Sequence, residues 1–145
     1  MLFRSKEGGI LSVRVASEMD VPRTGRITNV YGGTNEAETW GKAAHWCDYS
    51  GSVEGKQVGI AVLDHPHSFR YPTHWHVRDY GLMTANPFAY AAYTDGVKDG
   101  SHTLKSGDTL AFRYRVVLHR QSCNDAQINE RYLDFVAPPR VTVTP

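Results

Sequence analysis

The chain has 145 residues, with 16 Lys or Arg, 15 Asp or Glu and a formal net charge of +1, which fits one compact domain spanning 1–145. Basic and acidic residues are interspersed, and no apolar run approaches the roughly 20 residues that cross a bilayer, which argues against nucleic acid and membrane as partners. The first residues contain no apolar signal segment, and the localisation stays open.

The first half of the sequence alternates between strand-like segments and polar turns. After an extended tail at 1–8, residues 10–16 place Leu11, Val13 and Val15 on one face, which predicts a half-buried strand. A short strand follows over 26–31. Residues 39–49 and 57–64 predict a hairpin around the seven-residue link SGSVEGK.

The second half contains the most polar strand. Over 73–79, the alternation places His74, His76 and Arg78 on one face and Trp75 and Val77 on the other. An Asn-Pro turn at 86–87 follows, and an aromatic run and a Gly/Asp-rich loop precede the longest predicted strand, 109–119.

Strand 109–119 has two unlike faces. One is apolar and predicts a core face, formed by Leu110, Phe112, Tyr114, Val116 and Leu118. The other carries Arg113, Arg115 and His119, either as a solvated surface or under a ligand or partner.

Residues 124–136 predict a helix, because apolar side chains recur at helical spacing, and 138–145 predict an extended tail. We therefore expect an all-β fold, an antiparallel β-sandwich or jelly roll with one short C-terminal helix.

Four of the seven histidines lie in DHPHSFRYPTHWHVRDY, residues 64–80. Such density indicates proton transfer, metal binding or recognition of a polar ligand. In one interpretation, the H-x-H pair His74 and His76 chelates a metal, because their imidazoles would lie about 7 Å apart on one strand face. His65 or His119 would complete the site for copper, iron, zinc or manganese. This resembles the cupin arrangement, although Asp79 falls on the opposite strand face from the two histidines.

A second interpretation needs no metal. His76, Arg78, His65 and Asp64 would form a catalytic centre acting on a saccharide, since His and Asp pairs serve as general acids and bases. Aromatic rings stack on sugars while polar side chains bind their hydroxyl groups. The substrate-binding candidates are Asp48, Trp75, Asn86, Arg113 and Arg115. Most of the tryptophans (Trp40, Trp46 and Trp75) are expected in the core. Cys47 and Cys123 are expected to be ordinary thiols, and a disulfide between them stays open.

Three blocks, WGKAAHWCDYSGSVEGKQVGIAVLDHP, YPTHWHVRDYGLMTANPF and LKSGDTLAFRYRVVLH, resemble the C-terminal half of a bacterial family known as methane oxygenase PmoA-like. The resemblance runs from about Gly9 to Val136. It implies a β-rich protein with a carbohydrate-linked role and maps the family pattern onto Trp46, Asp48, Tyr49, Asp64, His65, Pro66, Trp75, His76, Arg78, Asp79, Asn86, Pro87 and His119. His74, His45 and His67 lie outside that pattern.

Members of the resembled family are about twice as long as this chain. A half-length sandwich would leave sheet edges and an apolar face exposed, so we expect a homodimer. The sequence therefore leaves three functional hypotheses: a saccharide-active enzyme, a metalloprotein that acts as an oxidoreductase on polysaccharide, and a non-catalytic carbohydrate-binding module.

Overall fold

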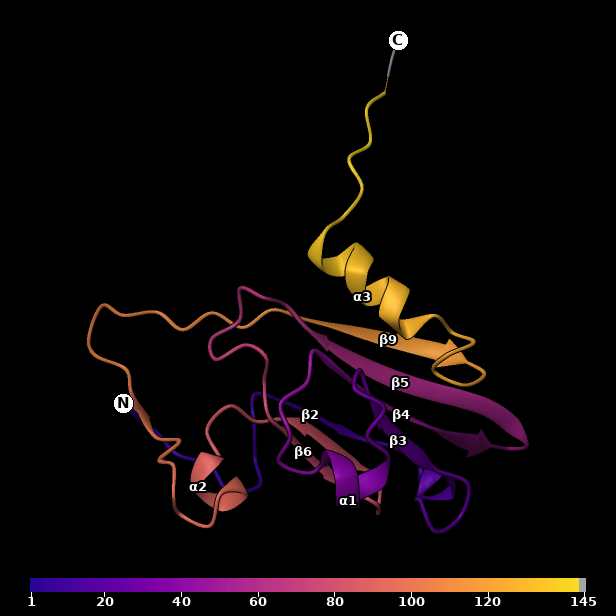
Figure 1. Cartoon of the computed structure of the whole chain (residues 1–145), viewed down its shortest axis with the longest axis horizontal. Coiled ribbons are helices and arrows are strands. Elements are labelled where there is room, and N and C mark those ends of the chain that lie inside the picture. Colours follow the sequence, from indigo (N-terminus) through magenta and orange to yellow (C-terminus); the bar gives the residue numbers. More distant parts are fainter. Residues whose placement is uncertain (144–145) are drawn as a thin grey trace.

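Two antiparallel sheets form the body of the protein in the computed structural model, which describes residues 1–143 (Figure 1). The larger has the order β3 (Arg26–Asn29), β4 (Trp46–Val53), β5 (Lys56–Asp64) and β9 (Tyr114–Arg120). The smaller has the order β2 (Leu11–Arg14), β7 (Leu82–Ala85) and β6 (Trp75–Arg78). A short pair joins β1 (Leu2–Phe3) to β8 (His102–Thr103). The predicted all-β class is confirmed.

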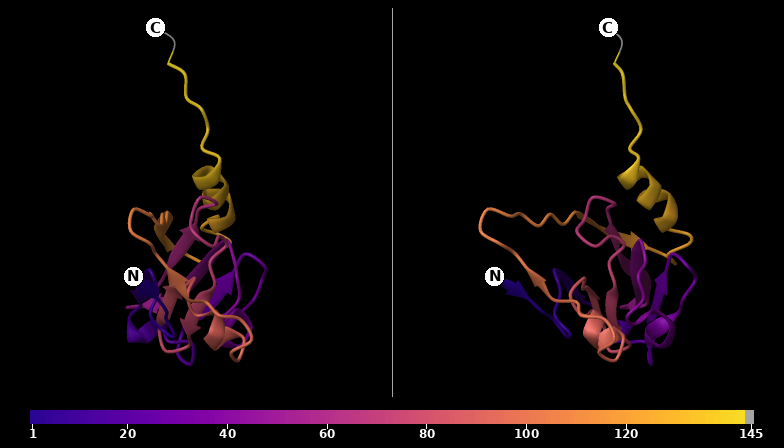
Figure 2. Two further views of the ribbon diagram at one scale, coloured as in Figure 1. Left: turned by 90° about the vertical axis from the view of Figure 1, so that its left-hand side faces the viewer. Right: turned by 60° about the vertical axis from the view of Figure 1, so that its left-hand side comes forward.

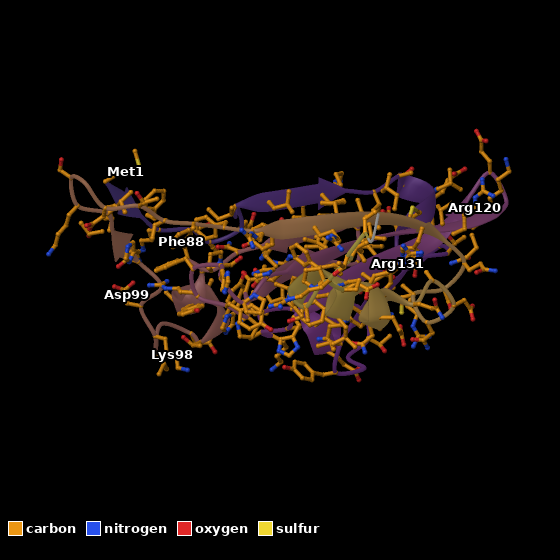
Figure 3. All side chains as sticks on the ribbon, turned by 90° about the horizontal axis from the view of Figure 1, so that it is seen from above. Met1, Phe88, Lys98, Asp99, Arg120 and Arg131 are labelled. Carbon is orange, nitrogen blue, oxygen red and sulfur yellow. The ribbon has the colours of Figure 1, made fainter. Side chains whose placement is uncertain are left out.

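The helical elements are short: η1 (Ser17–Met19), α1 (Asn35–Thr39), α2 (Tyr90–Tyr93) and α3 (Ile128–Val136). Within residues 1–143, no helix is long and apolar enough to cross a membrane. Figure 3 shows Met1, Phe88 and Lys98 at one end of the molecule and Arg120 at the other. The β1–β8 pair and α2 therefore lie far from the end of β9.

Apolar side chains from both larger sheets meet in the main core. This core contains Ile27, Cys47, Tyr49 and Val62 from the four-stranded sheet and Trp75, Val77, Met83 and Ala85 from the three-stranded sheet. The opposite face of the four-stranded sheet packs under α3 in a second core, which includes Trp46, Leu63, Ile128 and Tyr132. Cys47 and Cys123 are buried free thiols, as expected.

The hairpin of β4 and β5 is tighter than predicted. Its turn is the pair Glu54 and Gly55, with φ of 50° and 73°, and Val53 pairs directly with Lys56. Two consecutive positive φ values give a turn whose twist matches that of the flanking strands. The predicted seven-residue link is therefore wrong. The strand predicted to begin at residue 39 begins only at Trp46, because Thr39 ends α1 and residues 40–45 form a turn and an irregular segment with one isolated bridge, Ala43 to His74.

The strand predicted over 109–119 begins only at Tyr114. Val116 and Leu118 were expected in the core, yet they are 47% and 79% exposed. β9 is the edge strand of a four-stranded sheet that faces a sheet of three strands. The apolar face of β9 consequently lacks a cover, which corrects the prediction of a buried face.

The two ends of the chain also differ from expectation. Residues 1–8 are more than a tail, because Leu2–Phe3 pairs with His102–Thr103. α3 begins at Ile128, four residues later than predicted, because Gln127 adopts a left-handed φ of 55°. Residues 138–143 extend away from the body in both views of Figure 2, and 144–145 of the predicted tail lie outside the described residues.

Candidate functional site

The two faces of β6 are as the sequence alternation predicted. Trp75 and Val77 point into the main core, 1% and 0% exposed. His76 lies on the opposite face and is itself only 1% exposed, because Trp40 packs against it with ring centroids 6.3 Å apart. His74 contacts Tyr90 and Tyr93, with ring centroids 4.5 Å and 5.9 Å away.

A cavity of about 520 Å³ opens beside this face. Its side-chain walls include Glu36, Trp40, Lys42, Arg78 and Tyr93, and we call it the Trp40 cavity. α1 supplies Glu36 and ends just before Trp40, and it packs against β6, which supplies Arg78. The cavity therefore joins residues that are about 40 positions apart in the sequence.

His76 fixes the position of the Trp40 indole by a hydrogen bond. The indole Nε1–H of Trp40 donates a hydrogen bond to Nδ1 of His76 over 3.2 Å. An accepting Nδ1 requires a neutral ring with its proton on Nε2. Burial, aided by the charge of Arg78, lowers the pKa of His76 and favours this neutral form. His76 is thus a positioning residue for the indole.

Arg78 and Glu36 form the charged wall. Nη1 of Arg78 lies 2.5 Å from Oε1 of Glu36, and the backbone N–H of Asp79 donates to Oε2 of Glu36 over 3.0 Å. The hydrogen bond to Glu36 is the main reason that the pKa of Arg78 is raised. The guanidinium of Arg78 also lies over the Trp40 ring, 5.6 Å from its centroid.

Tyr93 completes the aromatic wall. Its ring meets Trp40 edge to face, with centroids 5.2 Å apart and an interplanar angle of 89°. Its hydroxyl is buried and has no hydrogen-bond partner within residues 1–143. An aromatic pair beside a paired guanidinium and carboxylate gives the cavity both an apolar and a polar side.

Asp64 and His65, predicted to be catalytic with His76 and Arg78, lie elsewhere. Asp64 is fully buried at the end of β5, and its Oδ2 accepts the N–H of Thr73 over 2.8 Å. The ring of His65 packs 5.0 Å from Phe135 of α3. These two residues tie down the loop that leads to β6 and do not line the Trp40 cavity. The predicted catalytic quartet is therefore divided between two places.

Asp48 and His119 form a buried pair on the α3 side of the four-stranded sheet. Nε2 of His119 lies 2.6 Å from Oδ1 of Asp48, and the two side chains are 3% and 0% exposed. The imidazole crosses β5 at Gly59, where any Cβ would overlap its ring. Burial lowers the pKa of His119, but the hydrogen bond and charge of Asp48 outweigh it, so the pKa is raised overall.

The remaining substrate-binding candidates also have structural positions. Trp75 is a core residue, and its Nε1–H donates to the carbonyl of Ala44 over 2.9 Å. Asn86 is buried, and its Oδ1 accepts the N–H of Phe88 over 3.1 Å. Arg113 is exposed, and Arg115 lies over the Phe135 ring at 4.5 Å. None of them lines the Trp40 cavity.

The four proposed metal ligands are not brought together. His74 lies against Tyr90, His76 against Trp40, His65 against Phe135 and His119 against Asp48. Across the described chain, no group of three or more His, Cys, Asp or Glu side chains could hold a metal ion. The separation of His76 from His119 follows from the faces they occupy, because His76 points away from the main core and His119 lies on the α3 side of the four-stranded sheet.

Sequence reasoning missed Glu36, Lys42 and Tyr93, and it placed Trp40 in a predicted strand. A signal for α1 was present, because Thr34 is an acceptable N-cap residue followed by two glutamates. Glu38 indeed reaches back to the N–H of Thr34 over 2.8 Å. No local signal marks Lys42 or Tyr93, which reach the cavity only through the tertiary fold.

Comparison with known proteins identifies one family. The family described as "Family of unknown function (DUF6807)" matches residues 1–133, nearly the whole chain. No curated protein and no solved structure matches the chain.

Proposed function

We infer that this protein, which belongs to the family of unknown function DUF6807, binds a saccharide in the Trp40 cavity. The observation that carries this proposal is the joint placement of Trp40 and Tyr93 beside the paired Arg78 and Glu36. Sugars present apolar C–H faces and a rim of hydroxyl groups, so their sites combine aromatic rings with a few fixed polar groups. The resemblance to PmoA-like proteins, with its carbohydrate-linked role, supports the same ligand class.

The environment of the cavity favours binding over turnover. Acid–base catalysis needs a group that is free to exchange a proton with the ligand. Both oxygens of Glu36 accept hydrogen bonds from protein groups, and Nδ1 of His76 accepts one from Trp40. Of the three hypotheses drawn from the sequence, the carbohydrate-binding module therefore has the most support, and the enzyme and metalloprotein hypotheses have less.

The test is a calorimetric titration of a panel of neutral and acidic oligosaccharides into the wild type and Trp40→Ala. Stacking of an aromatic ring contributes about 1 kcal/mol or more, so we expect Trp40→Ala to weaken binding by roughly a factor of ten. Tyr31→Ala is the matched control, because Tyr31 is 65% exposed and lies outside the cavity. Equal affinity of wild type and Trp40→Ala for every bound sugar would refute the proposal.

A further inference from the structure

We propose that the saccharide is acidic, and that a uronic acid unit places its carboxylate between Arg78 and Lys42 in the Trp40 cavity. This inference rests on the proposed function and names its ligand class. Some hydrogen-bonding groups at the cavity are already engaged within the protein and others are not, and this difference points to an acidic ligand.

The carboxylate that Glu36 contributes to the cavity wall is already engaged within the protein. Oε1 of Glu36 is bound by Arg78, and Oε2 is bound by the N–H of Asp79. The backbone of Glu36 is fixed as well, because its N–H donates to Oδ1 of Asp79 over 2.9 Å. Glu36 is therefore held against Arg78 and β6, and about half of the roughly four acceptor sites of its carboxylate are already used.

The donors of the wall, in contrast, are in excess. Lys42 is exposed and takes part in no ion pair in the described part of the chain. Nε of Arg78 and the hydroxyl of Tyr93 also have no hydrogen-bond partner within residues 1–143, but both atoms are shielded from solvent, so the accessible donors are the Lys42 ammonium and the exposed part of Arg78. Arg78 keeps 27% of its side chain exposed, so it remains within reach of a ligand.

Charge leads to the same ligand. Arg78 and Lys42 carry two positive charges and Glu36 one negative charge, so the cavity wall has an excess of one positive charge. A neutral sugar has no negative charge to interact with this excess. A carboxylate supplies both the negative charge and the oxygen acceptors, and guanidinium and ammonium groups bind it through charge-assisted hydrogen bonds. The aromatic pair would meanwhile contact the apolar face of the sugar ring.

The experiment compares three trisaccharides on the full chain by calorimetry. One is a linear uronate trisaccharide, the second is the same molecule after reduction of its carboxyl groups, and the third is a neutral trisaccharide carrying sulfate esters. Each is titrated into the wild type, Lys42→Gln and Lys56→Gln at low and high salt. Lys56 is the matched control because it is also exposed but lies in the β4–β5 hairpin.

We expect the uronate to bind the wild type about tenfold more tightly than its reduced form, with the difference shrinking at high salt. Lys42→Gln should remove most of this preference and Lys56→Gln should keep it. Equal binding of the uronate and its reduced form would overturn the acidic class while leaving saccharide binding intact. Equal or tighter binding of the sulfated sugar would overturn the carboxylate assignment. Failure of all three, and of the neutral sugars in the panel above, would overturn both proposals.

Discussion

At the scale of single residues, Asp64 gives the clearest link between burial and pH. Its carboxyl group is fully buried, and burial raises its pKa from 3.8 to about 6. The folded protein therefore holds a proton that the unfolded chain releases between about pH 4 and pH 6. Its contribution to stability is complete below pH 4 and is lost as the pH rises through 6.

We expect Asp64→Asn to remove this loss, because the amide oxygen still accepts the N–H of Thr73 and carries no charge at any pH. A pKa difference of two units corresponds to about 2–3 kcal/mol. Denaturant unfolding of wild type and variant between pH 4 and pH 7 measures it. Asp134→Asn, at an exposed position of α3, should follow the wild type. If the free energy of unfolding depends on pH in the same way for Asp64→Asn and the wild type, the raised pKa of Asp64 is contradicted.

Residue identity alone did not predict where the side chains of the histidines lie. Their density in 64–80 predicted a site for proton transfer, metal binding or polar-ligand recognition, but His65, His74 and His76 each face a different aromatic neighbour. Strand alternation predicted the face of His76 and Arg78. It could not predict that Trp40 covers His76, because that contact joins residues 36 positions apart.

At the scale of elements, the strands with clear alternation could be predicted from the sequence, whereas the short helices α1 and α2 were not predicted. Residues 10–16 and 73–79 show the period of two and form β2 and β6 with the expected faces. α1 and α2 have only five and four residues, too short for a helical period to stand out in the sequence. These two elements supply Glu36, Ala37 and Tyr93 to the wall of the Trp40 cavity, so the strand framework was predicted better than the site.

β9 shows that a correctly predicted strand face need not be buried. Its alternation was read correctly, but burial depends on whether an opposing strand exists, and the facing sheet ends before β9. Val116 and Leu118 are left exposed beside a shallow apolar groove of about 350 Å³ that also involves Val13 and Ile60. Sequence alternation specifies which side chains share a face, whereas the neighbouring sheet decides whether water reaches it.

At the scale of the whole molecule, the homodimer expected from the sequence remains a prediction, and the β9 face is where we expect it to form. An exposed apolar strand face at a sheet edge is a surface that association would bury. We expect the wild type to be dimeric in light scattering and Leu118→Asp to be monomeric with its fold retained. Val97→Asp is the control, because Val97 is 83% exposed in a loop. A monomeric wild type at high protein concentration would contradict the prediction.

The central claim is that a saccharide occupies the Trp40 cavity, and the three tryptophans allow it to be tested within one sample. Two-dimensional ¹H–¹⁵N spectra resolve the indole N–H of Trp40, which lines the cavity, from those of Trp46 and Trp75, which are 5% and 1% exposed in the two cores. On titration with the uronate trisaccharide, we predict a saturable shift of the Trp40 signal while the other two stay in place. No movement of the Trp40 signal, or equal movement of all three, would contradict the account.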